Sequence, residues 1–169
     1  MKYLLIVFAF ITTVISSAAA QEREGVNPND VDSIDSVMRA YYEAVSGPPG
    51  IRDYKRILTL YLPNAKLNIS TPDGELVHGI VEEVVMTKKF QTISTDFYER
   101  EISRDEQRFG DMANVISTYG ISDAWENENY TARGVTVFQM RKYNGRWWIM
   151  SSMWQRESDD LPLPAHLLD

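Results

Sequence analysis

Apolar positions recur with two different periods along the chain. Between residues 31 and 93 they recur mainly at three- and four-residue spacing, which is typical of amphipathic helices. From residue 97 to residue 157 they alternate with polar residues, as in half-buried strands. The first region predicts helices from a cap at Asn29 or Asp30 to Val45, over 53–61 and over 79–93, with a small hairpin over 65–78. The second region predicts four strands, over 97–109, 112–125, 132–143 and 146–157.

Short turns separate the four predicted strands. Gly110-Asp111 and Asn144-Gly145 are two-residue hairpin turns, and residues 126–131 form a longer polar connection. Consecutive strands joined in this way form an antiparallel meander. Helices packed on one face of a curved sheet make an α+β domain, and this is the fold class that the sequence predicts.

The first twenty residues have the layout of a secretory signal peptide. Lys2 is their only charge, an apolar run covers residues 4–14, and three alanines end at Ala20. The run is shorter than the roughly 20 residues that span a bilayer. We therefore expect cleavage after Ala20 and a periplasmic or extracellular protein with no membrane association after cleavage. The expected divisions are a signal peptide (1–20), a flexible arm (21–29), one domain (30–157) and an extended tail (158–169).

Charge and composition argue against nucleic acids and metal ions as binding partners. The chain carries a formal net charge of −7, and acidic proteins are poor ligands for nucleic acids, whose contacts depend on Lys and Arg. It has no cysteine, and its two histidines, His78 and His166, lie far apart in the sequence. We therefore expect no metal site. The sequence also has no Gly-rich phosphate loop, and we expect no cofactor. Without disulfides, the stability of the domain must come from its hydrophobic core.

The last predicted strand is apolar on both faces. Trp147, Ile149, Ser151 and Met153 share one parity; the other parity contains Trp148, Met150, Ser152 and Trp154. A strand at a protein surface is normally apolar on one face only. Each face of this strand therefore needs a cover, from the core, a ligand or a second copy of the chain.

Several local patterns resemble the nuclear transport factor 2-like superfamily, which includes SnoaL-like cyclases and ketosteroid isomerases. They are Asp53 followed by Leu58 and Tyr61, then Asn64-Ala65-Lys66-Leu67, His78-Gly79, and the hairpin from Tyr143 to Ile149. The resemblance covers about residues 30–157 and identifies the chain as an exported, bacterial-type member of unassigned function. It implies a cone: three helices packed in a strongly curved, mainly antiparallel mixed sheet, with an apolar pocket at the open end. Such a fold does not by itself define a function.

The resemblance offers one test for catalysis. Ketosteroid isomerases use a carboxylate base, a tyrosine and a protonated acid in an apolar pocket. Tyr41 falls where their tyrosine lies, but Ile69 falls where the base would be, and no carboxylate occurs at residues 137–139. Two of three groups are missing, which argues against that activity. Asp123 and Tyr119 share a strand face, so Tyr41 with Asp123 is the candidate pair for a cofactor-free SnoaL-like lyase or isomerase; the alternative is a solvated strand end.

The resemblance also predicts which strand face lines the pocket. It aligns Met150 and Trp154 with pocket residues, and aromatic and thioether groups suit a small hydrophobic or aromatic molecule. The predicted pocket residues are Tyr41, Ile69, Phe90, Tyr119, Trp148, Met150, Ser152 and Trp154. The opposite parity, Trp147, Ile149, Ser151 and Met153, is the predicted face of a homodimer.

Three functions remain open at this point. The leading prediction is an exported small-molecule-binding domain without assignable catalysis. The alternatives are the lyase or isomerase and an exported protein-interaction module acting through the sheet face. In a further alternative there is no pocket, because the aromatic residues fill the interior of the cone as part of the hydrophobic core.

Overall fold

A computed structural model describes residues 23–70, 74–87 and 92–168 of the chain. Three α-helices and two 3-10 turns occupy η1 (Pro28–Asp30), α1 (Ile34–Val45), α2 (Tyr54–Leu60), α3 (Val81–Val85) and η2 (Ala165–Leu167). The strands are β1 (Gly50–Ile51), β2 (Tyr61–Ser70), β3 (Leu76–Ile80), β4 (Thr92–Ile93), β5 (Tyr98–Phe109), β6 (Met112–Ser122), β7 (Ala132–Tyr143) and β8 (Arg146–Arg156). No helix among these residues is long and apolar enough to cross a membrane.

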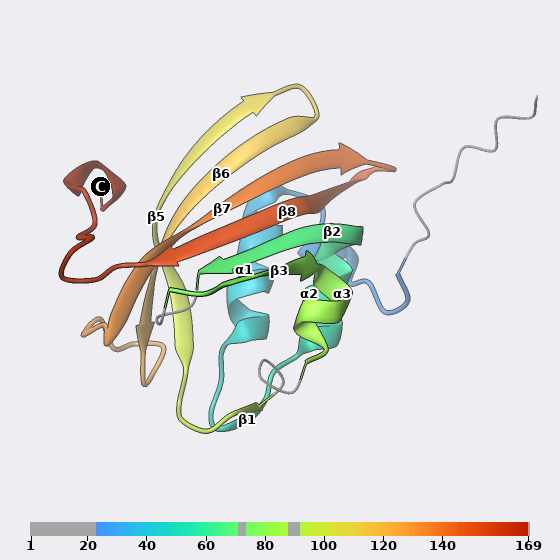
Figure 1. Cartoon of the computed structure of the whole chain (residues 1–169). Coiled ribbons are helices and arrows are strands. Elements are labelled where there is room, and N and C mark those ends of the chain that lie inside the picture. Colours follow the sequence, from blue (N-terminus) through green and yellow to red (C-terminus); the bar gives the residue numbers. More distant parts are fainter. Residues whose placement is uncertain (1–22, 71–73, 88–91, 169) are drawn as a thin grey trace, which may run out of the picture.

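One curved sheet of six strands encloses the helices (Figure 1). Its order is β3-β2-β8-β7-β6-β5, and all neighbours are antiparallel except β2 and β8, which run parallel. The β5–β8 meander has the order that the turn residues predict, and β1 and β4 form a separate two-stranded ribbon. The α+β class with a mainly antiparallel mixed sheet is therefore confirmed.

The beginnings of the first two helices follow from local capping. Ser33 caps α1 by accepting a hydrogen bond from the Ser36 amide at 3.1 Å, and Asp53 caps α2 by accepting from the Arg56 amide at 3.0 Å. The predicted start of α1 at Asn29 or Asp30 is wrong. The side chain of Asn27 instead caps the separate turn η1, so the chain bends before α1 begins.

The third helix is much shorter than the predicted range 79–93. Gly79 pairs with Leu67 in the β2–β3 ladder, so the first residues of that range belong to a strand. α3 spans only Val81–Val85, in which three of five residues are valines that lose side-chain freedom in a helix. Of the rest of the range, Thr92 and Ile93 lie in strand β4, while Phe90 is outside the described residues.

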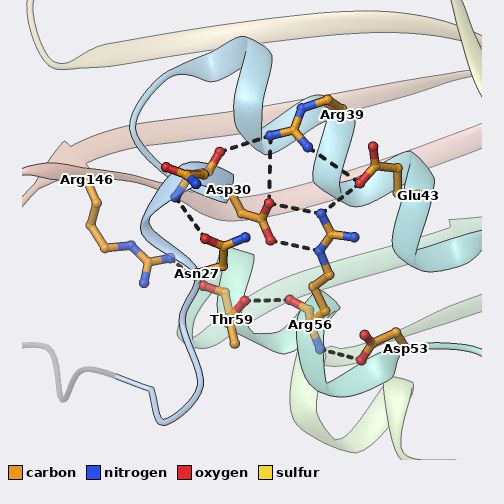
Figure 2. A network of polar contacts seen from close by, with 9 residues as sticks. Asn27, Asp30, Arg39, Glu43, Asp53, Arg56, Thr59 and Arg146 are labelled. Atoms are coloured by element: carbon orange, nitrogen blue, oxygen red, sulfur yellow. Dashed lines mark hydrogen bonds and ion pairs between the residues drawn. The ribbon is translucent and has the colours of Figure 1, made fainter.

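A buried carboxylate ties the helices together (Figure 2). Asp30 is 1% exposed and accepts two hydrogen bonds from the Arg56 guanidinium, at 2.7 and 2.9 Å. Arg39 lies 3.7 Å from the same carboxylate, and Glu43 accepts from Arg56 at 2.8 Å. Bidentate hydrogen bonds between charged groups are stronger than hydrogen bonds between neutral groups. They join η1, α1 and α2 into one unit beside the sheet.

The C-terminal tail lies against the outer face of the sheet. The carbonyl oxygen of Leu167 accepts a hydrogen bond from Thr118 at 2.6 Å and another from Ser103. The sequence predicts an extended tail, but Ala165–Leu167 form the 3-10 turn η2.

Candidate functional site

A cavity of about 600 Å³ lies between the helices and the inner face of the sheet. All three α-helices and the strands β2 and β4–β8 contribute to its wall, together with the loop before α2. Most of the wall is apolar or tyrosine, with a few charged or hydroxyl groups. The lining residues are Tyr41, Val45, Arg52, Tyr54, Ile57, Tyr61, Leu67, Ile69, Ser70, Val84, Val85, Ile93, Phe97, Glu99, Tyr119, Ile121, Thr136, Trp154 and Arg156. Core side chains therefore leave space inside the cone.

Four residues of the predicted pocket line this cavity: Tyr41, Ile69, Tyr119 and Trp154. A fifth, Ser152, is buried directly behind the wall, and its hydroxyl lies 2.8 Å from that of Tyr61. Residues from α1, β2, β6 and β8 thus meet at one place, although they are up to 113 residues apart in the sequence, from Tyr41 to Trp154.

A β-bulge changes the parity of β8 in its middle. Gln139 pairs with Ser151, whereas Met140 pairs with Ile149, so Met150 is the extra residue. Trp147 and Ile149 before the bulge face the core, as do Ser152 and Trp154 after it. Because side chains alternate with a period of two, one extra residue moves every later side chain of the strand to the opposite face. Each of the two predicted faces therefore has some residues inside the protein and some outside.

The bulge makes part of the site prediction wrong. Met150, a predicted pocket residue, is 38% exposed on the outer face. Trp148, another, does not line the cavity. The Arg146 guanidinium covers the Trp148 ring and lies 3.7 Å from its centroid. The predicted dimer face fails in the same way. Trp147 and Ile149 are 2% and 0% exposed inside the monomer, and only Ser151 and the 51%-exposed Met153 reach the surface.

Asp123 does not reach the cavity. Strand β6 ends at Ser122, so the alternation that would align Asp123 with Tyr119 stops one residue earlier. Asp123 is exposed in the following loop, where it accepts a hydrogen bond from Asn127 at 2.6 Å. The Tyr41–Asp123 pair predicted for catalysis is therefore wrong.

Glu99 contributes a carboxyl group to the cavity wall, and the sequence pattern does not predict this position. Glu99 lies on β5 opposite Ile121 of β6, and it lines the cavity wall. Burial raises its pKa to about 7, while the positive charge of Arg156 acts in the opposite direction. Strand β5 contains charged residues at both parities, which is typical of a solvated strand, so nothing in the alternation distinguishes Glu99 from its charged neighbours.

Tyrosine hydroxyls surround this carboxyl group. Burial raises the pKa of Tyr119 to about 12 and raises those of Tyr41 and Tyr61 as well, so all three are protonated donors at neutral pH. The negative charge of Glu99 contributes to each of these increases, which places it close to all three. Gly134 admits the Tyr119 ring, because a Cβ there would lie 2.4 Å from the Tyr119 hydroxyl.

Two arginines complete the polar part of the wall. Arg52, before α2, is 5% exposed and donates to the carbonyl oxygens of Pro48 and Gly47, at 2.5 and 2.9 Å. Arg156, at the end of β8, is exposed and close enough to lower the pKa values of both Glu99 and Tyr119. These groups can bind a polar substituent of an otherwise apolar molecule, or move a proton to or from it. The described residues contain no cluster of side chains suited to hold a metal ion.

Comparisons with known proteins identify the fold but no activity. No family model matches the sequence, and no curated protein matches it. Among solved structures, a cystatin-like protein of unknown function from Nostoc punctiforme is similar at 15% identity and TM-score 0.56, covering 75% of this chain and 90% of that one. A nuclear transport factor 2-like superfamily protein from Salmonella enterica gives 14% identity, TM-score 0.54 and coverages of 78% and 92%.

A third similar structure is the association domain of CaMKII from C. elegans. It is 17% identical with a TM-score of 0.52, and the match covers 72% of this chain and 92% of that domain. Similarities at these identities concern the fold alone. The chain has the nuclear transport factor 2-like fold that the sequence resemblance implied.

Proposed function

We propose that this chain binds a small, largely apolar organic molecule in the cavity of its nuclear transport factor 2-like fold. The observation that carries the proposal is the cavity itself. Its volume of about 600 Å³ lies within the range of roughly 300–1,000 Å³ usual for ligand pockets. Its wall combines apolar and aromatic side chains with a few polar groups, which is the usual composition of such pockets.

A neutral fluorescent probe tests this proposal. N-phenyl-1-naphthylamine should bind the wild-type protein with increased emission, and Ile69→Trp should abolish the increase by filling the cavity. Met153→Trp is the matched control, because it adds the same side chain on the outer face of β8. Equal binding by Ile69→Trp and the wild type would place the probe elsewhere and refute the proposal.

Glu99 supports a second candidate function, cofactor-free proton transfer on a bound molecule. A general acid or base works best when its pKa lies near the working pH, and burial raises the pKa of Glu99 to about 7. Tyr41, Tyr61 and Tyr119 are hydroxyl donors on the same wall and could stabilise a developing oxyanion. This candidate replaces Asp123 with Glu99 in the lyase or isomerase prediction.

Isotope exchange distinguishes the second candidate from binding alone. If Glu99 moves protons to and from carbon, the protein should accelerate deuterium exchange next to the carbonyl of a bound apolar ketone, as measured by NMR. Glu99→Gln should lose this acceleration, whereas Glu106→Gln, an exposed control on the same strand, should keep it. Acceleration that persists in Glu99→Gln would exclude Glu99 as the acid–base group.

The homodimer remains a proposal, with a revised face. Met153 on β8 lies opposite Val137 on β7, which lies opposite Ile116 on β6. All three alternate with residues of the inner face; Val137 and Ile116 are half-buried, and Met153 is 51% exposed. Exposed apolar patches often mark contacts between proteins, and the same surface would serve the interaction module predicted as an alternative. Light scattering should give the mass of a dimer at micromolar concentration, and Met153→Lys should give the monomer.

Export is also a proposal and rests on the sequence of residues 1–20, which lie outside the described residues. Expression of the full chain followed by N-terminal sequencing should give a mature protein that begins at Gln21.

A further inference from the structure

The cavity wall contains two arginines that form no ion pair within 4.0 Å with a carboxylate of the described residues. Six arginines elsewhere in the described chain form ion pairs with Asp or Glu within 4.0 Å: Arg23, Arg39, Arg56, Arg100, Arg104 and Arg133. Among the described residues, neither Arg52 nor Arg156 has such a pair, and both line the cavity. Among the described residues, Arg108 and Arg141 also lack such a pair, but both are exposed and neither lines the cavity. Arg52 and Arg156 differ from them in lining the cavity, and Arg52 differs also in being buried.

Arg52 is fixed in place without being neutralised. Its two terminal nitrogens donate to the carbonyl oxygens of Pro48 and Gly47, and its Nε has no hydrogen-bond partner among the described residues. The guanidinium is also 6.0 Å from the centroid of the Phe97 ring. Carbonyl oxygens orient a guanidinium but carry no full charge, and the negative charge of Asp96 acts on Arg52 only from beyond ion-pair distance. A buried charge without a close counter-charge is costly. An anion in the cavity would offset that cost.

Glu99 does not serve as the missing counter-charge. No ion pair within 4.0 Å joins Glu99 to either arginine, and burial favours its neutral form up to about pH 7. Below that pH the wall therefore carries two guanidinium charges and no carboxylate charge, although the protein as a whole carries −7.

We propose that the ligand is an amphipathic organic acid, whose apolar body packs against residues such as Ile69, Ile121 and Trp154 and whose acidic oxygens pair with Arg52 or Arg156. Planar guanidinium groups match carboxylates with two parallel hydrogen bonds, which gives specificity as well as affinity. This inference rests on the proposed binding function and adds the chemical class of the ligand.

A matched pair of probes tests the inference directly. 1-Naphthaleneacetic acid and 1-naphthaleneacetamide share the same ring and chain, and only the first carries a negative charge at pH 6.5. Isothermal titration calorimetry at that pH should show at least tenfold tighter binding of the acid. Arg156→Gln and Arg52→Gln should each reduce this preference, and the one that removes it identifies the pairing residue.

Two further variants guard against a folding defect. Arg52→Lys retains the charge and should retain most of the preference even if the loop at Gly47 adjusts. Arg141→Gln, on the outer parity of β7, should leave the preference unchanged.

The outcomes separate this inference from the function on which it rests. If the amide binds as tightly as the acid, or if the preference survives in the Arg52→Gln/Arg156→Gln double variant, the acid class is wrong and cavity binding stands. If neither the two naphthalene probes nor the neutral fluorescent probe binds, both the inference and the proposed function fail.

Discussion

Two carboxylates pointing into the interior of this protein have opposite surroundings. Asp30 accepts two hydrogen bonds from Arg56 and has Arg39 at 3.7 Å, so its charge is fully compensated (Figure 2). Glu99 faces an open cavity, has no ion pair among the described residues, and its pKa is raised to about 7. The first arrangement stabilises the packing of helices. The second leaves a titratable group available to a ligand.

The arginines show the same difference. Arg56 binds two carboxylates, those of Asp30 and Glu43, which raise its pKa. Arg52 is close to it in the sequence but donates to loop carbonyls, and burial lowers its pKa. The paired Arg56 joins helices, whereas Arg52 is buried in the cavity wall without an ion pair among the described residues. We take a buried, unpaired charge in the cavity wall as a sign of the binding site.

The largest expected effect comes from breaking the compensated pair. Asp30→Asn removes the charge that Arg56 and Arg39 share, and removing one partner of a buried ion pair costs about 3 kcal/mol of the free energy of unfolding. Urea denaturation would measure this loss. Asp35→Asn is the control, because Asp35 is 87% exposed and its ion pair with Arg104 contributes little. Equal destabilisation by both variants would remove the distinction on which the comparison rests.

The second prediction concerns the pH dependence that Glu99 contributes. Because its pKa rises from an ordinary 4.5 to about 7 on folding, the folded state binds the proton more tightly. The stabilisation is complete below about pH 4.5 and is lost as the pH rises through 7. Its size is about 2 kcal/mol after allowance for solvent in the cavity. The charged and titratable groups facing Glu99 are Tyr41, Tyr42, Tyr61, Tyr119 and Arg156.

Urea unfolding at pH 5 and pH 8 measures this contribution. The decrease between the two values should be smaller in Glu99→Gln than in the wild type, whereas Glu106→Gln should keep the full decrease. An unchanged decrease in Glu99→Gln would show that the carboxyl group is ionised at neutral pH, and the cavity would then resemble the Asp30 network.

The sequence predicts much of the fold and a part of the site. The strand pattern gives the meander with its turns, because each turn carries its own chemistry at Gly110, Asn144 and Gly145. Of the pocket residues that the resemblance and the alternation predict, Tyr41, Ile69, Tyr119 and Trp154 line the cavity. The bulge at Met150 has no signal in the local pattern, since residues on both sides of it are apolar. Glu99 and Arg52 were missed because their environment depends on long-range packing.

A smaller effect is expected behind the cavity wall. Ser152→Ala removes the hydroxyl that lies 2.8 Å from the Tyr61 hydroxyl and should lower the free energy of unfolding by about 1 kcal/mol. Ser151→Ala, on the outer side of the bulge, should change it by less, because the Ser151 hydroxyl bonds Gln139 at the surface. A larger effect at Ser151 would mean that the parity after the bulge is reversed.

The most direct test of the central claim is to locate a bound acid by NMR. Protein with labelled isoleucine and methionine methyl groups, titrated with 1-naphthaleneacetic acid, should show contacts between the naphthalene protons and the methyl groups of Ile69 and Ile121 in the cavity. Contacts with the methyl groups of Met150 and Met153 instead would place the molecule on the outer face of the sheet and contradict the account.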